Sequence, residues 1–269
     1  MRKIILHYHL FKNAGTSVDE LLKMNFPDQW VTREFSAAQH GANNAQVQHW
    51  VQQEKNAVAF SSHTAMLPPP ELEEVEFFPI LFVRHPIDRI ASAYAFERKQ
   101  LKEGSLGAIL ARHTSLAGYI EVRLALGHDR QCRNFHSTRL AQMFHGEGGD
   151  ENALALRALE SLPFVGLVEE FDLSIERMAE WLAPHFPGFH TVPVAKNVTR
   201  DRSISLEQRL EQIREEVGEA CYTQVLEANA GDFAVFEKVR ARYSAMIEAE
   251  VKPGEEQTTS DATENVVQV

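Results

Sequence analysis

The hydrophobic positions of this chain fall into short continuous runs separated by longer amphipathic stretches. Four runs of large apolar residues, each bounded by polar or turn-forming residues, cover 4–10, 57–61, 77–83 and 163–168. Runs this short and continuous are typical of buried strands. We therefore predict four strands, and the helical sequence between them favours an α/β fold: a parallel sheet flanked by helices on both faces.

Helical patterns follow the predicted strands. One helix begins near Thr16 or Ser17, either of which can cap it, and Pro86 suits the first turn of another. Further helices are predicted over 43–53, through most of 101–162, and over 173–182, 206–229 and 233–248. Residues 251–269 have little apolar content and are predicted to be disordered. The sequence thus predicts one domain over 1–250 with a helical C-terminal part, and a tail over 251–269.

Composition restricts the partners of this fold. Hydrophobic residues make up 44% of the 269 positions, as in ordinary globular proteins, and the net charge of −11 argues against binding of bulk nucleic acid or an anionic membrane. A site for an anionic ligand would therefore have to be a local basic pocket. The N-terminus is a poor signal peptide, no window approaches the length of a membrane span, and we expect a cytoplasmic protein. Two reduced thiols, Cys132 and Cys221, are favoured over a lone disulfide.

The loop Phe11-Lys12-Asn13-Ala14-Gly15-Thr16-Ser17 joins the first predicted strand to the first helix. A helix N-terminus offers unpaired N–H groups and partial positive charge to an anion. Lys12 adds a cation, Gly15 permits close approach of the backbone, and Thr16 and Ser17 add hydroxyl donors. The Walker A pattern is absent because Lys12 precedes the glycine. The alternative is that Lys12 is a solvated loop residue and Thr16 only a cap.

A second strand end also carries anion-binding chemistry. The run ending at Val83 leads into Arg84, and Ser92 lies about two turns along the following helix. Ligands of open α/β sheets bind at the carboxyl ends of the strands, where Arg84 and Ser92 could hold one phosphate from two sides. Alternatively, Arg84 forms a local salt bridge with Asp88 and Ser92 is a small packing residue.

Together the two segments resemble the donor-binding motifs of the sulfotransferases that use 3′-phosphoadenosine 5′-phosphosulfate (PAPS). Residues 9–17 resemble the loop for the 5′-phosphosulfate, and residues 84–94, RHPIDRIASAY, resemble the 3′-phosphate motif RxPxDRxxSxY. Residues 134–140 and 164–172 are similar to later segments of the carbohydrate-directed branch, which includes heparan sulfate 2-O-sulfotransferase and bacterial relatives. The resemblance covers about residues 4–245.

The resemblance implies a P-loop-NTPase-like fold and transfer of a sulfuryl group from PAPS to an acceptor hydroxyl, with adenosine 3′,5′-bisphosphate as the product. Asn13, Ala14, Gly15, Thr16 and Ser17 would bind the donor with Lys12, which would also stabilise the leaving phosphate. Arg84 and Ser92 would bind the 3′-phosphate. No metal is expected, because side chains and the helix N-terminus would neutralise the charge.

The predicted base is His63, which follows the second strand at the same sheet edge as Lys12 and Arg84. A histidine is suited to general-base catalysis near neutral pH. In the carbohydrate-directed branch a Gly-His pair closes the corresponding strand and its histidine is the base; here Ser62 replaces that glycine. The weaker candidates are His7, His9 and His85.

Acceptor recognition is less specific in the sequence. Arg130, Arg133, His136 and Arg139 form a basic cluster, and Arg133 and Arg139 are candidates for binding sulfate or carboxylate groups of a sugar. The cluster could equally be a helix face paired with glutamates. Arg200 lies in a polar basic segment that, by resemblance, helps close over the nucleotide. The RKG pattern of cytosolic small-molecule sulfotransferases is absent, which argues against a phenol or steroid acceptor.

Two other functions compete with this interpretation. The first is a nucleotide-dependent kinase or NTPase, which would require a Walker A loop and a strand-end aspartate for Mg²⁺, and neither is evident. The second is a non-catalytic nucleotide-binding module on the same fold. The presence of Lys12, His63, Arg84 and Ser92 together favours an enzyme. The acceptor's identity and the oligomeric state are not encoded in any recognisable pattern.

Overall fold

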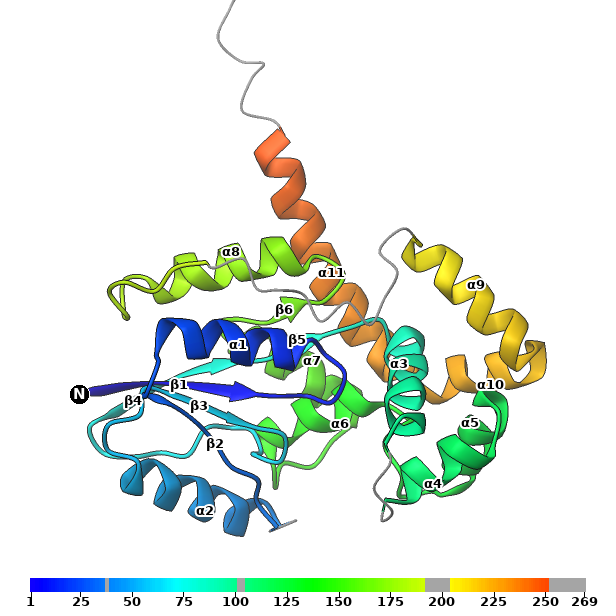
Figure 1. The fold of residues 1–269 in the computed structure, drawn as a ribbon, viewed down its shortest axis with the longest axis horizontal. Helices are drawn as coiled ribbons and strands as arrows, with labels where there is room; N and C mark the ends of the chain where they lie inside the picture. Colours follow the sequence, from blue (N-terminus) through cyan, green and yellow to red (C-terminus); the bar gives the residue numbers. More distant parts are fainter. Residues whose placement is uncertain (37–38, 101–104, 192–203, 252–269) are drawn as a thin grey trace, which may run out of the picture.

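The computed structural model describes residues 1–36, 39–100, 105–191 and 204–251. Its centre is a parallel sheet with strand order β2-β3-β1-β4 (Figure 1). The strands are β1 (Arg2–Tyr8), β2 (Trp30–Thr32), β3 (Ala59–Ser62) and β4 (Val75–Ile80). A second parallel sheet contains two strands, β5 (Phe82–Val83) and β6 (Gly166–Leu167), and β5 follows β4 directly in the chain. The predicted α/β fold with a parallel sheet is confirmed.

Alternating side chains of β1 face two separate cores. Ile4 and Leu6 pack on one face of the sheet, against α2 (His40–Gln53), α7 (Glu151–Ser161) and α11 (Ala230–Val251). Ile5 packs on the other face, against α1 (Gly15–Asn25) and α8 (Phe171–Leu182). Because neighbouring strand residues point to opposite faces, β1 is buried on both sides, as expected for a parallel sheet with helices on both faces.

A third core of helices lies beyond the carboxyl ends of the strands, on the right in Figure 1. It contains α3 (Pro86–Arg98), α4 (Leu106–His113), α5 (Leu116–Ala125), α9 (Leu206–Val217) and α10 (Glu219–Ala228). The short helices α6 (Phe135–Ala141) and η1 (Gln142–Phe144) lie between α5 and α7 in the chain. Cys132 and Cys221 are both free and buried in this third core, so the predicted reduced thiols are confirmed.

Three elements differ from the sequence-based prediction. The predicted strand 77–83 is divided at Leu81 into β4 and β5, and the two parts pair in different sheets. The predicted helix 206–229 breaks at Gly218, whose φ of 78° interrupts the helix. The prediction omitted β2, because a three-residue strand is too short to show a periodic pattern.

The parallel arrangement brings the carboxyl ends of the strands to one edge. The loop after β1, His63 after β3 and Arg84 after β5 all begin at this edge, as does Glu34, two residues beyond β2. In the described part of the chain, no helix is long and apolar enough to cross a membrane. The predicted disordered tail lies outside the described residues apart from Val251, with which α11 ends.

Candidate active site

The loop after β1 has a strained backbone that opens into α1. Lys12 and Ala14 both adopt left-handed conformations, with φ of 65° and 61°. This region costs a residue with a side chain about 1 kcal/mol or more, and such strain is common at ligand sites. Ala14 precedes α1 without a side-chain cap, and the Ser17 main-chain N–H donates back to the Ala14 carbonyl at 2.9 Å. The amides of Gly15 and Thr16 remain available to another acceptor. The geometry suits the predicted anion site.

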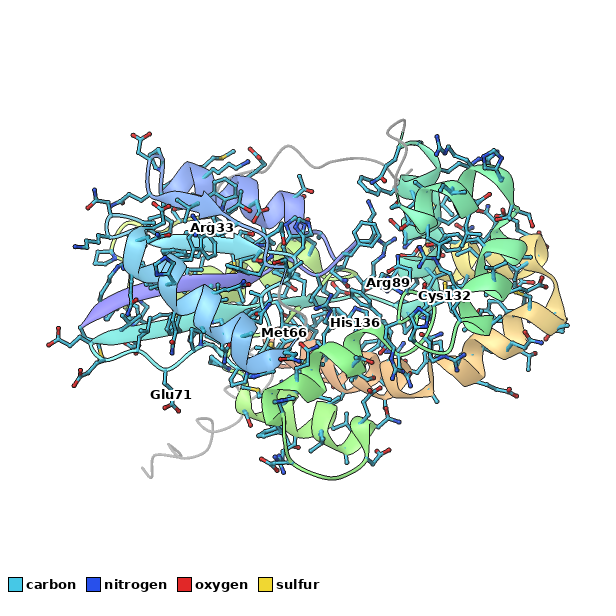
Figure 2. The ribbon with its side chains drawn as sticks, turned by 90° about the horizontal axis from the view of Figure 1, so that it is seen from below. Arg33, Met66, Glu71, Arg89, Cys132 and His136 are labelled. Atoms are coloured by element: carbon cyan, nitrogen blue, oxygen red, sulfur yellow. The ribbon has the colours of Figure 1, made fainter. Side chains whose placement is uncertain are left out.

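Asn13 anchors this loop to the interior. Its Oδ1 accepts from His136 Nε2 at 2.8 Å, and its own amide donates to the Phe11 carbonyl at 3.0 Å. His136 lies in the interior, fully buried (Figure 2), with Nδ1 3.1 Å from Asp232 Oδ2. Burial raises the pKa of Asp232, but the charge and hydrogen bonds of His136 outweigh it and hold that pKa below its usual value. A buried ion-pairing network thus fixes the loop from α6 and α11.

A cavity of about 270 Å³ opens between this loop, α3 and α9. Its charged and hydroxyl lining consists of four cations, two carboxylates and one serine: Lys12, Arg84, Lys99, Arg209, Asp88, Glu216 and Ser92. Cations therefore outnumber carboxylates four to two. The sequence motifs at Lys12 and at Arg84 therefore contribute to the same cavity. In an acidic protein, this is the local basic pocket that an anionic ligand requires.

Arg84 is 4% exposed, and its guanidinium donates three hydrogen bonds. Nη1 donates to the Lys12 carbonyl at 2.8 Å, Nε donates to Asp88 Oδ2 at 3.0 Å, and Nη2 donates to the Asp88 carbonyl at 3.0 Å. The local salt bridge considered from the sequence is therefore present, and Arg84 lines the cavity as well. Ser92 shares that lining.

The cavity's electrostatics favour an anion. Burial lowers the pKa of Lys12, and the neighbouring cations Arg84 and Lys99 lower it further. The Lys12 ammonium lies 4.5 Å from the centre of the Phe96 ring. An anionic group in the cavity would relieve the repulsion among these cations.

Sequence reasoning missed Lys99 and Arg209. Lys99 directly follows α3, and Arg209 lies in α9 with Nε 3.2 Å from Asp88 Oδ1. Neither residue belongs to a motif, and only the packing of α9 against α3 brings Arg209 to the cavity. Arg200, the donor-binding residue predicted in this part of the chain, lies outside the described residues.

His63 is half-exposed and held by a carboxylate that the sequence did not indicate. Its Nδ1 lies 2.7 Å from Glu34 Oε1, and its main-chain N–H donates to Glu34 Oε2 at 3.1 Å. The Thr64 hydroxyl also donates to Glu34 Oε2, at 2.9 Å. Burial raises the pKa of Glu34, but the hydrogen bonds from His63 and Thr64 outweigh it and lower the pKa. A carboxylate on Nδ1 leaves Nε2 of a neutral His63 as a proton acceptor.

Next to His63, His7 and His9 both contact Asp19 of α1, each through Nδ1 at 2.8 Å. The two histidines are separated by one residue, so they face the same side, toward the buried face of α1. Ligand atoms of His7, His9 and Asp19 lie within 4.8 Å of one another, close enough to hold a metal ion. No sequence spacing predicted this cluster, because Asp19 comes from a different element.

Comparison with known proteins agrees with this geometry. Residues 2–146 match the model of the sulfotransferase family, more than half of the chain. The chain belongs to the sulfotransferase family. It is also 43% identical over 247 residues to an uncharacterized protein of Archaeoglobus fulgidus, an alignment that covers 90% of this chain and 98% of the relative. The family is one of sulfuryl-transferring enzymes, whose members generally use PAPS as the donor.

The candidate acceptor residues of this sulfotransferase, Arg133 and Arg139, lie outside the basic cavity between the loop after β1, α3 and α9. Arg133 Nη2 donates to the Leu124 carbonyl at 2.8 Å, and the half-buried Arg139 has its guanidinium carbon 5.9 Å from the Phe135 ring centre. The exposed Arg130 pairs with Glu151 at 3.6 Å, so the glutamate pairing considered from the sequence is present, although Arg130 lies in the segment between α5 and α6 and not on a helix face. The acceptor role of Arg133 and Arg139 stays a prediction.

A second hollow, of about 440 Å³, has Glu34 in its lining. Glu34 lines it and also holds His63, so the hollow adjoins the candidate base. Its remaining lining comes from the residues after β2 and from α2: Arg33, Phe35, Ser36, Ala45, Gln46 and His49. The polar lining can hydrogen-bond a hydroxylated molecule.

Proposed function

We propose that this enzyme transfers a sulfuryl group from PAPS to a hydroxyl of a carbohydrate or glycolipid, as in the heparan sulfate 2-O-sulfotransferase branch and its bacterial relatives. One observation carries the proposal. The loop after β1 lines the basic cavity through Lys12, and His63, held by Glu34, stacks on His9 just before that loop, at the same edge of the sheet. Donor and base would therefore meet at the N-terminus of α1.

The donor would be held at both of its anionic ends. Arg84 and Ser92, with Lys99 and Arg209 beside them, would bind the 3′-phosphate in the basic cavity. The 5′-phosphosulfate would lie against the loop and the first turn of α1, formed by Asn13, Ala14, Gly15, Thr16 and Ser17. The amides of Gly15 and Thr16 and the hydroxyls of Thr16 and Ser17 would donate to it, because the main-chain N–H groups of Asn13 and Ser17 already donate to Leu10 and Ala14. We keep Arg200 as a proposed donor-binding residue.

The chemistry needs a base and a stabilised leaving group. His63 Nε2 would take the proton of the acceptor hydroxyl while its oxygen forms a bond to sulfur, and the bond between sulfur and the phosphate oxygen would break. Lys12 would offset the negative charge that develops on that phosphate oxygen. The products are a sulfate ester and adenosine 3′,5′-bisphosphate. These roles require no metal ion.

The hollow beside Glu34 is the proposed place of the acceptor. Its size suits one or two sugar units, and Arg33, Gln46 and His49 offer polar contacts in a hollow that Glu34 links to His63. Arg133 and Arg139 remain proposed contacts for more distant parts of a glycan. We propose that residues 1–250 form the sulfotransferase domain, and we retain the predicted tail and cytoplasmic location.

A transfer assay with labelled PAPS against a panel of glycans, glycolipids and small alcohols tests the proposal. Lys12→Ala and His63→Ala should each abolish transfer, whereas His63→Ala should still bind adenosine 3′,5′-bisphosphate. The matched controls are Lys55→Ala and His113→Ala, two exposed residues away from the site. Full activity of Lys12→Ala and His63→Ala would overturn the mechanism.

Ligand binding distinguishes the competing functions. A sulfotransferase should bind adenosine 3′,5′-bisphosphate without Mg²⁺, and ATP should not displace it. Mg²⁺-dependent ATP binding would instead support a kinase or NTPase. Tight bisphosphate binding with no transfer to any acceptor of the panel would support the non-catalytic module.

A further inference from the structure

The ring of His63 is restrained by a second histidine. Its centroid lies 3.9 Å from that of His9, with the ring planes 28° apart, so the two imidazoles are stacked. Glu34 holds the Nδ1 edge of the same His63 ring at 2.7 Å. One restraint acts on an edge and the other on a face. Together they fix the orientation of a side chain that is otherwise half-exposed to solvent.

His9 is itself rigidly held. Its Nδ1 donates to Asp19 Oδ2 at 2.8 Å, and its main-chain N–H donates to the Ser62 carbonyl at 2.9 Å. The other carboxylate oxygen of Asp19 accepts from His7 Nδ1 at 2.8 Å and from the Ser61 hydroxyl at 2.5 Å. Burial raises the pKa of Asp19, but the hydrogen bonds from His7 and His9 outweigh it and hold that pKa well below its usual range. Asp19 is therefore an ionised anchor.

The opposite edge of the His9 ring touches the donor loop. A Cβ atom on Gly15 would lie 2.0 Å from Cδ2 and 2.3 Å from Nε2 of His9, so only glycine leaves room for the ring. Gly15 is the first residue of α1, where the 5′-phosphosulfate is proposed to bind. The His9 ring thus fills the space between the donor loop and His63.

We propose that His9, anchored by Asp19, is a positioning residue that fixes the base His63 relative to the donor loop. The inference rests on the proposed function for the role of His63. Because misplacement of a reacting group by about 1 Å can cost roughly 100-fold in rate, a ring that packs against both His63 and Gly15 would affect turnover rather than donor binding.

The hydrogen bonds of the cluster favour this role over a metal site. Three donors, from His7, His9 and Ser61, match the two acceptor oxygens of Asp19, and every one of these contacts has hydrogen-bond length. Both oxygens of Asp19 are therefore satisfied as hydrogen-bond acceptors. A metal bound by His7, His9 and Asp19 is the competing interpretation, and the experiment below includes it.

The test compares His9→Ala and Asp19→Asn with the wild-type enzyme. We expect kcat to fall by roughly 100-fold in His9→Ala and about tenfold in Asp19→Asn, while KM for PAPS and Kd for the bisphosphate stay within about twofold. His9→Phe, which restores a flat ring against His63, should recover part of the kcat lost in His9→Ala. The exposed His113→Ala is the control.

Three results would overturn the proposal: an unchanged kcat in His9→Ala, a KM for PAPS that rises as much as kcat falls, or stoichiometric metal in the purified wild-type protein that is lost in His9→Ala. A readout independent of activity is the ring ¹H–¹³C NMR signal of His63. It should be a single narrow signal in the wild type and broaden or shift in His9→Ala, and an unchanged signal would also refute the proposal. Failure of the proposed function itself would appear as a wild-type protein that transfers no sulfate.

Discussion

Arg84 donates from Nη1 to the main-chain carbonyl of Lys12 at 2.8 Å. The contact joins two motifs that are 72 positions apart in the chain. Lys12 is held at a φ of 65°, which costs a lysine about 1 kcal/mol or more and persists only where the surroundings enforce it. Arg84 is one such enforcing contact. The two parts of the proposed donor site are therefore joined by a hydrogen bond. A substitution at Arg84 should also change the conformation of the loop at Lys12.

Arg84→Lys should weaken binding of adenosine 3′,5′-bisphosphate by about tenfold or more. The substitution keeps a cation but loses the planar fork that reaches both Lys12 and Asp88. Isothermal titration calorimetry at constant ionic strength measures the change. The matched control is Arg157→Lys, at an arginine paired with Glu147 on the surface, where affinity should not change. Wild-type affinity in Arg84→Lys would show that the fork is dispensable.

Glu34→Gln should lower kcat by at least tenfold while leaving KM for PAPS unchanged. A glutamine amide can donate to His63 Nδ1, which would place the imidazole proton on Nε2 and remove the proton acceptor. Steady-state kinetics at saturating PAPS measures the loss. The double variant Glu34→Gln/His63→Ala should be no slower than His63→Ala alone. Additive losses would mean that Glu34 does not act through His63.

His136→Phe should destabilise the fold and weaken bisphosphate binding together. His136 is fully buried between Asn13 Oδ1 and the Asp232 carboxylate. Removing its donors leaves a buried carboxylate with one fewer partner, and breaking a buried ion pair costs about 3–5 kcal/mol. The substitution also releases the loop after β1, where the donor is proposed to bind. Urea unfolding and calorimetric binding check both effects.

Substitution of Asp232 helps to separate these two effects. Asp232→Asn keeps His136 in place and should cost less stability than His136→Phe, with a smaller loss of bisphosphate affinity. If His136→Phe were destabilised but bound the bisphosphate normally, the network would support the core without shaping the loop.

The sequence predicted the sheet and the donor motifs because these are local patterns. Four apolar runs located β1, β3, β4 with β5, and β6, and the residue types around Lys12 and Arg84 identified two anion-binding strand ends. Parallel strands then required both to lie at one edge. Division of the run at Leu81 and the helix break at Gly218 depend on pairing and packing, which periodicity does not encode.

The missed site residues share a physical reason. Glu34, Asp19 and Arg209 each act through a partner on another element, at sequence separations of 29 from His63, 10 from His9 and 121 from Asp88. Each is an ordinary charged residue in a polar stretch, and only tertiary packing gives it a role. A histidine or a glycine-containing loop is recognisable alone, but the carboxylate that orients it is not.

Glu169 should make stability depend on pH in the neutral range. Its Oε1 accepts from the His85 main-chain N–H at 3.0 Å, just behind Arg84, and burial raises its pKa from 4.5 to about 7. A carboxyl whose pKa is raised on folding stabilises the folded state fully at pH values below its pKa in the unfolded chain. This stabilisation is lost as pH rises through the folded-state pKa of about 7. Between pH 5 and 8 the wild type should therefore lose about 2 to 3 kcal/mol that Glu169→Gln does not lose.

Urea unfolding of both proteins at several pH values measures this difference directly. The comparison cancels the opposite contribution of His85, whose pKa burial lowers to about 4, because His85 is present in both proteins. His85 contributes fully to stability at pH values above its pKa in the unfolded chain, and this contribution is lost as pH falls through the folded-state pKa of about 4. Parallel stability curves for wild type and Glu169→Gln would mean that Glu169 is ionised in the folded protein throughout. In that case the charge behind Arg84 would be a permanent carboxylate, and donor affinity would not change with the protonation of Glu169.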